Sequence, residues 1–245
     1  MASAKLTLAA ALVELTVELP HNTRLWQVDL DAYATLVSLG GASAAERERA
    51  HRMAFERDAR RYLASRHALR QVLGMVMGVA PQEVRVDIDS VGKPCCAGAR
   101  AVQFNLSHAG HIGLIAVGLS TRALGVDIEI IRPIAEVEAL ARSHFSPEER
   151  ENWSRVPAEQ RVAAFLAIWV RKEACLKALG VGLSAQPSSI NVSEISCIPE
   201  VSVPLGERRC EVSVYAVRLA SELVAAMALA EPSAVALARR YFQAT

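Results

Sequence analysis

Two short stretches carry residue types that could bind a metal ion or a phosphate. On a helix, Trp169, Glu173 and Lys177 fall at i, i+4 and i+8, so an aromatic ring, a carboxylate and an ammonium share one face. On a strand, Asp127 and Glu129 fall at i and i+2 and share one face of the sheet. An isolated Glu–Lys pair is most often a surface ion pair that stabilises its helix only slightly. A functional role therefore requires the strand and the helix to meet.

The strand expected at residues 124–131 is otherwise built from small and β-branched residues, with Val126 and Ile128 on the face opposite the two carboxylates. Two carboxylates on an apolar strand are costly without a counter-charge. A solvated edge strand could carry them, but a divalent hard cation is the more economical partner. Mg²⁺ takes carboxylate oxygens and keeps water and substrate phosphates in its other positions. We therefore expect a magnesium site here.

The segment 44–73 is a second candidate for charged-ligand binding. It contains no Gly or Pro, and Ser43 with Glu46 makes a capping box, which predicts a long helix or a broken helix pair. Arginines with acidic neighbours in its first half indicate a solvated face. The later, less compensated arginines suit phosphate, because a guanidinium fork matches phosphate oxygens. These later arginines are Arg60, Arg61, Arg66 and Arg70.

The surrounding pattern predicts an α+β chain. Strands are expected at 24–30, 84–88, 102–108, 112–119 and 124–131, and later at 190–192, 200–203, 210–219 and 223–230. Helices are expected at 31–39, 44–73, 135–142 and 159–179, with a helix start at Ser146 and a short, helical or irregular segment at 232–242. The polar break 120–122 predicts a junction between subdomains 1–121 and 122–245.

Composition excludes several function classes. The chain has 245 residues, 52% of them hydrophobic, which is enough for a sizeable core. The net charge of +1 predicts no nucleic-acid coat. Five cysteines without a C-x-x-C pair argue against a disulfide framework and a zinc site, and favour the reducing cytoplasm. No apolar run approaches the roughly 20 residues of a membrane span, and Glu14 interrupts the short run at 6–13.

Five motifs follow one another along the chain. They are Lys93-Pro94, Asn105-Leu106-Ser107-His108, Gly125-Val126-Asp127-Ile128-Glu129, Phe145-Ser146-x-x-Glu149 and Trp169-x-x-Lys172-Glu173-Ala174-x-x-Lys177. In this order they resemble the 4'-phosphopantetheinyl transferases of the two-domain Sfp type. The resemblance covers about half of the chain, residues 61–184. It implies an α+β fold of two pseudo-twofold-related subdomains, each a small antiparallel sheet packed with helices, with the active site in the cleft between them.

The resemblance also implies an activity. Enzymes of this family transfer 4'-phosphopantetheine from coenzyme A, the co-substrate, to a serine hydroxyl of an acyl or peptidyl carrier protein and release adenosine 3',5'-bisphosphate. They activate polyketide, nonribosomal peptide or fatty acid synthases and need Mg²⁺, for which Mn²⁺ is a substitute. We expect a cytoplasmic protein from its cysteines, without nucleic-acid partners because of its balanced charge and without membrane partners because no apolar run is long enough. A monomer is expected because one chain supplies both halves of the cleft.

Residue roles are carried over by matching each motif position. The implied magnesium ligands are Asp127, Glu129 and Glu173, and Lys177 matches the lysine at the pyrophosphate. The expected catalytic residues are Lys177 and Glu173, and the chemistry makes Glu173, directly or through a metal-bound water, the candidate general base. The implied coenzyme contacts are Arg61, Arg66, Lys93, Ser107, His108, Lys172 and Lys177. His108 is expected to read the 3'-phosphate, although a lone histidine in a loop is more often without a role.

The chemistry of these residue types agrees with the resemblance. Breaking a pyrophosphate with a serine hydroxyl needs neutralised phosphoryl oxygens, an in-line nucleophile and a route for the proton. A non-catalytic binder of coenzyme A and carrier proteins is one alternative, but it would not need three carboxylates and Lys177. A different Mg²⁺-dependent enzyme acting on a free nucleotide is another, but the chain lacks a Walker-type glycine-rich loop.

Overall fold

The computed structural model describes residues 7–17, 19–38, 41–98, 102–182, 185–192 and 200–244. Expectations that concern residues 1–6, Gly40 or Cys197 lie outside these residues. Among the described residues, no helix is long and apolar enough to cross a membrane. The described cysteines, Cys95, Cys96, Cys175 and Cys210, are free thiols.

The N-terminal half is built on a four-stranded sheet with the order β1-β2-β6-β5. Its antiparallel strands are β1 (Leu12–Glu14), β2 (Thr23–Asp29), β5 (Val102–Ala109) and β6 (Ile112–Leu119). Its helices are α1 (Leu8–Ala11), α2 (Leu30–Leu36), α3 (Ala44–His51) and α4 (Glu56–Met77). Between α4 and β5 lie a 3₁₀ turn, η2 (Pro81–Glu83), and a hairpin of β3 (Val86–Ile88) and β4 (Pro94–Cys96).

The C-terminal half has a second four-stranded antiparallel sheet, with the order β7-β10-β9-β8. Its strands are β7 (Ala123–Ile130), β8 (Glu200–Leu205), β9 (Arg208–Val217) and β10 (Leu223–Ala230). Its helices are α5 (Val137–His144), α6 (Pro147–Ser154), α7 (Arg161–Leu179) and α8 (Pro232–Ala244), and its 3₁₀ turns are η3 (Ala158–Gln160) and η5 (Pro187–Ser189).

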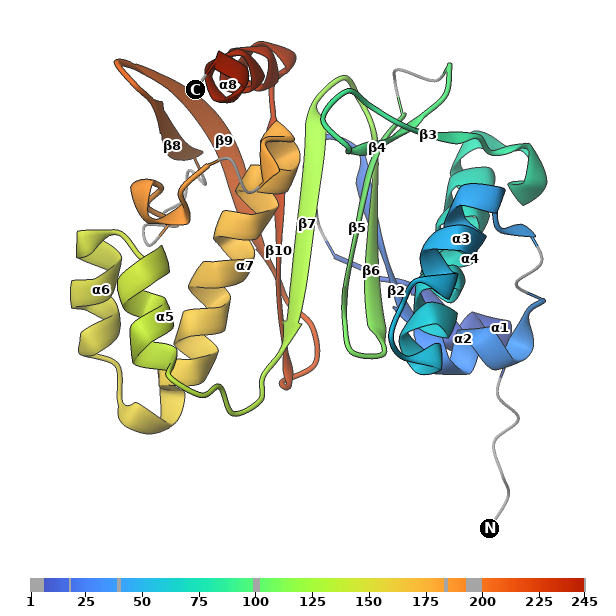
Figure 1. The fold of residues 1–245 in the computed structure, drawn as a ribbon, viewed down its shortest axis with the longest axis horizontal. Helices are drawn as coiled ribbons and strands as arrows, with labels where there is room; N and C mark the ends of the chain where they lie inside the picture. The colour runs from blue at the N-terminus through green and yellow to red at the C-terminus, as the bar shows by residue number, and fades with distance from the viewer. Residues whose placement is uncertain are drawn as a thin grey trace.

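The two sheets face each other, with a long helix on the outer side of each (Figure 1). Leu69 of α4 and Ile115 of β6 share one core. Leu179 of α7 shares another core with β8, β9 and β10. Between the sheets, Leu114 and Val126 belong to a third core. The predicted α+β class, with small antiparallel sheets packed with helices, is confirmed; the division at 121/122 falls between β6 and β7 and stays a prediction about folding units.

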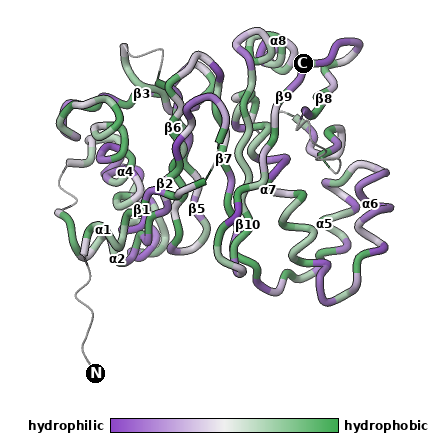
Figure 2. The backbone as a smooth tube through the Cα atoms, turned by 180° about the vertical axis from the view of Figure 1, so that it is seen from behind, coloured by the Kyte–Doolittle hydropathy of each residue, from purple (hydrophilic) through white to green (hydrophobic). Residues whose placement is uncertain are grey.

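Strand β7 is the structural link between the halves because its alternate residues face different partners. Leu124, Val126 and Ile128 are fully buried against the other sheet. The intervening residues, Gly125 and Asp127, face α7. Hydrophobic colour runs along the central strands, whereas α6 is largely hydrophilic (Figure 2). The alternation predicted for the two carboxylates is therefore the one that the strand adopts.

The arginine-rich segment forms a broken helix pair. Helix α3 begins at the predicted capping box of Ser43 and Glu46, and α4 begins after Phe55. The sequence predicts that Gly74, Gly78 and Pro81 end this helical segment. Helix α4 continues to Met77 and ends at Gly78, whose φ of +70° makes it a left-handed cap.

Two other predictions need correction or refinement. The expected strand at 190–192 does not form, although Ile190 and Val192 are fully buried. These residues make buried apolar contacts without pairing with a neighbouring strand. The hydrophobic pattern of such a segment is the same as that of a short buried strand. The segment after Pro232 is helical, and the capping box of Ser146 and Glu149 starts α6 as predicted.

Replacing Gly125 by Ala should destabilise the protein strongly. A Cβ atom at this position would lie 2.1 Å from the carbonyl oxygen of Ala174 and 2.4 Å from the backbone nitrogen of Ala178, so β7 or α7 must move. We expect a loss of about 3 kcal/mol in the free energy of unfolding, measured by urea denaturation. Gly118→Ala is the matched control, because its Cβ would meet only the side chain of Leu124 at 3.4 Å and that of Thr23 at 3.7 Å. Equal effects of the two changes would contradict the proposed backbone contact.

Candidate active site

A network of three side chains, of which Ser107 and Asp127 are buried and Lys177 is partly exposed, joins the two halves of the molecule. The Nζ atom of Lys177 donates to Oδ1 of Asp127 at 2.6 Å and to Oγ of Ser107 at 3.0 Å. The Ser107 hydroxyl in turn donates to the same Asp127 oxygen at 2.8 Å. Ser107 comes from β5, Asp127 from β7 and Lys177 from α7. The strand and the helix of the sequence motifs therefore meet, and the second half of the Asn105–His108 motif meets them.

Backbone contacts hold these three elements together. The side-chain oxygen of Asn105 accepts a hydrogen bond from the backbone nitrogen of Val126 at 2.9 Å, which joins the edge strands β5 and β7 of the two sheets. Gly125 lets α7 lie directly against β7. Sequence reasoning quoted both residues within motifs but gave neither a role. The signal for Gly125 was a residue without a side chain inside a strand, which often marks close backbone approach.

Glu129 and Glu173 complete a cluster of carboxylates around the network. Burial, and then the charge of Asp127, raise the pKa of each. The negative charge is offset by Lys177 for both, and by Arg132 for Glu129. Within the described part of the chain, no three His, Cys, Asp or Glu side chains are already arranged to hold a metal ion. The donor set nevertheless fits Mg²⁺ chemically, since its carboxylates repel one another and carry oxygen ligands only.

His108 and Arg61, from the N-terminal half, are two of the predicted phosphate contacts. The exposed His108 follows Ser107 on β5, and desolvation of its ring, followed by the charges of Lys177 and Arg61, lowers its pKa. Arg61 forms a two-pronged ion pair with Asp31, with Nε 2.7 Å from Oδ1. The charges of Lys177 and Arg61 thus both act on the His108 ring, and those of Asp58 and Asp127 act in the opposite direction.

The structure gives Arg66 a partner within the fold. Its Nε lies 2.8 Å from Oε1 of Glu46, and Arg70 binds the other carboxylate oxygen at 2.9 Å. Arg66 and Glu46 are both buried. Arg66 and Arg70 therefore fasten α3 to α4 in this structure, whereas the resemblance implies a coenzyme contact for Arg66. The partner was visible in the sequence only as the last residue of a capping box.

Lys172 also lies away from the carboxylate cluster. It is fully buried, and its Nζ pairs with Oε2 of Glu149 at 2.7 Å and donates to the carbonyl oxygens of Pro187 and Ile190. These contacts tie α7 to α6 and to the segment around η5. The implied coenzyme contact of Lys172 therefore has no support in this structure. Lys172 directly precedes Glu173, and consecutive side chains of a helix do not share a face.

Lys93 meets the other half of the protein rather than open solvent. Its Nζ donates to the carbonyl oxygens of Leu124 at 2.8 Å, Lys177 at 2.6 Å and Ala178 at 3.4 Å. Burial, and then the charge of Arg239, lower the pKa of Lys93 to about 8. The three donors of its ammonium are thus directed at backbone oxygens.

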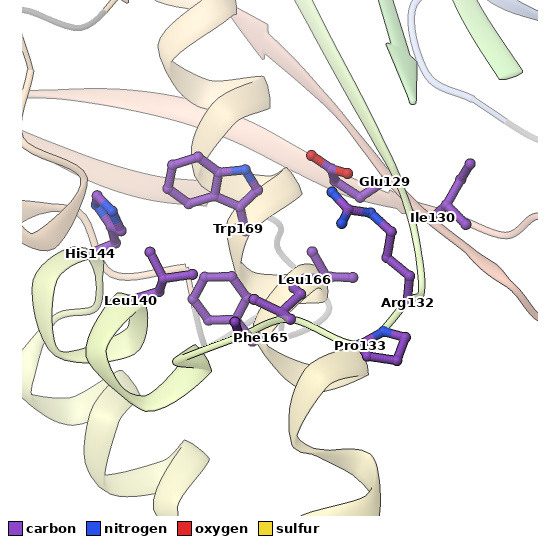
Figure 3. A pocket seen from close by; sticks show the side chains of 11 residues that line it. Glu129, Ile130, Arg132, Pro133, Leu140, His144, Phe165, Leu166 and Trp169 are labelled. Atoms are coloured by element: carbon purple, nitrogen blue, oxygen red, sulfur yellow. The ribbon is translucent and has the colours of Figure 1, made fainter. Parts of the chain in front are cut away.

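Two cavities lie at opposite ends of the α7 face that carries Trp169, Glu173 and Lys177. One, of about 290 Å³, opens beside Glu129 and is lined by Trp169, Phe165 and His144 (Figure 3). Trp169 stacks on Phe165 and meets the His144 ring edge-on, so it packs α7 against α5 and not only against the sheet. The other, of about 270 Å³, is lined by Lys177, Lys93 and other residues. This face therefore runs from the cavity beside Trp169, past Glu173, to the cavity beside Lys177.

Two family models match successive parts of the chain. The first, 4'-phosphopantetheinyl transferase, N-terminal, matches residues 25–119, and the second, 4'-phosphopantetheinyl transferase superfamily, matches residues 123–228. The first match includes Ser107, and the second includes Asp127 and Lys177. A two-halved α+β protein with a lysine–aspartate–serine network at its centre is thus the class that the fold and the site define.

Individual relatives agree with these models. The 4'-phosphopantetheinyl transferase HetI of Nostoc is 39% identical over 171 residues, covering 68% of this chain and 72% of the relative. The L-aminoadipate-semialdehyde dehydrogenase-phosphopantetheinyl transferase of Schizosaccharomyces pombe is 30% identical, covering 71% of this chain and 72% of the relative. The holo-[acyl-carrier-protein] synthase of Thermotoga maritima is a solved structure that is 15% identical to this chain, with a TM-score of 0.32. The match covers 44% of this chain and 62% of the synthase chain. The chain belongs to the 4'-phosphopantetheinyl transferase superfamily, a family of enzymes.

Glu46 should stabilise the protein in a pH-dependent way. Burial opposes ionisation, but hydrogen bonds from Arg66 and Arg70 outweigh it and lower the pKa of Glu46 from 4.5 to about 2. Because the folded-state pKa is the lower one, this contribution is complete above about pH 4.5 and is lost as the pH falls toward 2. Glu46→Gln should cost about 3 kcal/mol of unfolding free energy near neutral pH, and urea titrations should show the difference shrinking in acid. Glu48→Gln, on the exposed side of α3, is the control and should show neither effect.

Lys172→Met should lower stability without weakening coenzyme A binding. The change leaves the fully buried Glu149 carboxylate without its cation, which costs about 3–5 kcal/mol in such pairs. Calorimetric unfolding and coenzyme A titration measure the two quantities. The double variant Lys172→Met/Glu149→Gln should recover part of the loss, because no uncompensated charge stays buried. Weaker coenzyme binding at unchanged stability would instead return Lys172 to the coenzyme site.

Proposed function

We propose that the protein transfers the 4'-phosphopantetheine group of coenzyme A to a serine hydroxyl of an apo carrier protein, with Mg²⁺ as the metal. The observation that carries this proposal is the Lys177–Asp127–Ser107 network, which lies between the halves beside Glu129 and Glu173. The relatives named above are transferases of this group, which supports the same reaction class here.

The proposed coenzyme site follows the charge distribution. The phosphates bind beside His108, on which the positive charges of Lys177 and Arg61 both act. Arg61 takes part by sharing its guanidinium between Asp31 and a phosphate oxygen. The pantetheine arm extends along α7 toward the cavity lined by Trp169, where apolar and aromatic groups match its largely uncharged chain.

The proposed reaction forms one phosphorus–oxygen bond and breaks another. The carrier serine oxygen attacks the phosphorus that bears pantetheine, and the bond to adenosine 3',5'-bisphosphate breaks, so that the bisphosphate leaves as an anion. Lys177 offsets the charge that develops on the departing phosphate. Glu173 takes the serine proton, directly or through one water, because a buried carboxylate with a raised pKa is a better base than a solvated one.

The proposed metal ligands are Asp127, Glu129 and Glu173. When bound, Mg²⁺ would supply charge neutralisation on the pyrophosphate oxygens, and Mn²⁺ would substitute for it. For this role Asp127 has to share its oxygens between the ion, Ser107 and Lys177. Three carboxylates and one lysine also argue against the alternative, a non-catalytic adaptor that only binds coenzyme A and carrier proteins.

The proposed partners are acyl or peptidyl carrier domains of polyketide, nonribosomal peptide or fatty acid synthases. Both sides of the cleft come from one chain, since β5 supplies Ser107 and α7 supplies Lys177, which supports a monomer. The reducing cytoplasm is the proposed location, as the cysteine pattern favours.

Incubation with coenzyme A, Mg²⁺ and a panel of apo carrier proteins should add phosphopantetheine to the carrier, as measured by mass spectrometry. Glu173→Gln should slow transfer by about 100-fold or more while coenzyme A still binds in a calorimetric titration. Glu151→Gln, an exposed glutamate of α6, is the matched control and should behave as the wild type. Lack of transfer to every carrier would favour the adaptor, and near-normal transfer by Glu173→Gln would remove that residue from the role of base.

A further inference from the structure

The C-terminal end of α7 is completed by groups from two distant parts of the chain. A helix leaves its last four carbonyl oxygens without partners inside the helix. The Leu176 oxygen accepts the backbone nitrogen of Gly180 at 2.9 Å. The oxygens of Lys177 and Ala178 accept from Nζ of Lys93, at 2.6 and 3.4 Å. The last one, of Leu179, lies 3.4 Å from Nε of Arg239.

Both of these outside partners are cations. The negative end of a helix dipole favours positive charge, and the effect is greatest where the charge is partly shielded from water. Lys93 lies in the turn between β3 and β4 of the N-terminal half, whereas Arg239 lies in α8 near the C-terminus. Their common target is the last turn of α7, so this turn is held from two sides.

One carboxylate joins the two cations. Oδ1 of Asp89 accepts the backbone nitrogen of Lys93 at 2.8 Å, which shapes the turn that carries this lysine. Oδ2 of the same residue accepts Nη2 of Arg239 at 2.8 Å. The side chains of Asp89 and Arg239 are 22% and 24% exposed, so solvent screens this pair only in part.

The residue that Lys93 holds by its carbonyl oxygen is Lys177, whose own ammonium binds Asp127 and Ser107. We propose that Asp89, Lys93 and Arg239 form a clasp that fixes the end of α7 and thereby positions the Lys177 ammonium for the transfer reaction. The proposal rests on the proposed function. It makes Lys93 and Arg239 positioning residues, and it replaces the direct coenzyme contact that the resemblance implies for Lys93.

The hydrogen-bond inventory favours the clasp over a phosphate contact. A lysine ammonium has three donors, and those of Lys93 are directed at the oxygens of Leu124, Lys177 and Ala178. Turning the ammonium toward a phosphate would leave those carbonyl oxygens without this partner, at a cost of about 1–3 kcal/mol for each buried one. A phosphate contact would also give Arg239 no role in the reaction.

Kinetics of Arg239→Met and Asp89→Asn test the clasp without altering Lys93. Both should lower kcat by roughly tenfold and change the KM for coenzyme A by a smaller factor, because the negative charge that Lys177 offsets increases in the transition state. The double variant Lys93→Met/Arg239→Met should lose little more than either single change, since the residues act as one unit. Arg240→Met, at the next and exposed position of α8, is the matched control and should be unchanged.

Kinetics and hydrogen exchange distinguish the clasp from a direct contact between Lys93 and the coenzyme. An unchanged kcat in Arg239→Met and Asp89→Asn, with a raised KM in Lys93→Met, would overturn the clasp and restore the coenzyme contact. Hydrogen exchange gives a readout that needs no activity. The amides of Gly180 and Val181, which bond to the Leu176 oxygen, should exchange faster in Arg239→Met than in Arg240→Met. Equal exchange in the two variants would overturn the clasp, whether or not the wild type transfers phosphopantetheine. A wild type that transfers no phosphopantetheine would reject the proposed function but would not by itself reject the clasp.

Discussion

Helix α7 and strand β7 approach each other backbone to backbone at Gly125, and the geometry of the site depends on that approach. A single added carbon would lie 2.1 Å from the oxygen of Ala174, inside contact distance. This helix residue stands between Glu173 and Lys177 in sequence, so the two charged side chains leave α7 around the point of closest contact. Two residues along β7 lies Asp127, within 2.6 Å of the Lys177 ammonium. A wider spacing would separate these charges and expose them to water, where their interaction is far weaker.

Both halves of the protein stabilise their long helix by the same means. In each half a capping box starts a short helix, and its glutamate also turns toward the long helix. Glu46 binds Arg66 of α4, and Glu149 binds Lys172 of α7. Both glutamates also accept hydrogen bonds from their own cap residue, so each carboxylate fixes a helix start and the distance to the next helix at once. Such buried pairs add little net stability, but they penalise any other placement of the short helix.

The sequence indicated the local parts of this arrangement better than the long-range ones. The two faces of β7 and both capping boxes follow from periods and short spacings, and the structure has them as predicted. The partners of Lys172 and Lys93 do not follow, because Glu149 and the oxygen of Lys177 lie far away in sequence and only the packing of the elements brings them together. A motif marks a lysine as important without saying which atoms it binds.

Charge and polarity change along one face of α7 in an order that suits an extended substrate. The face begins with Trp169 beside an apolar cavity, continues with the Glu173 carboxylate and ends with the Lys177 ammonium. A ligand with an uncharged arm at one end and phosphates at the other can match the two ends of this face at the same time. The carboxylates between them repel each other, which a cation beside the phosphates would relieve. In the proposed function, substrate and metal ion therefore bind together, because each offsets the charge that the other would leave uncompensated.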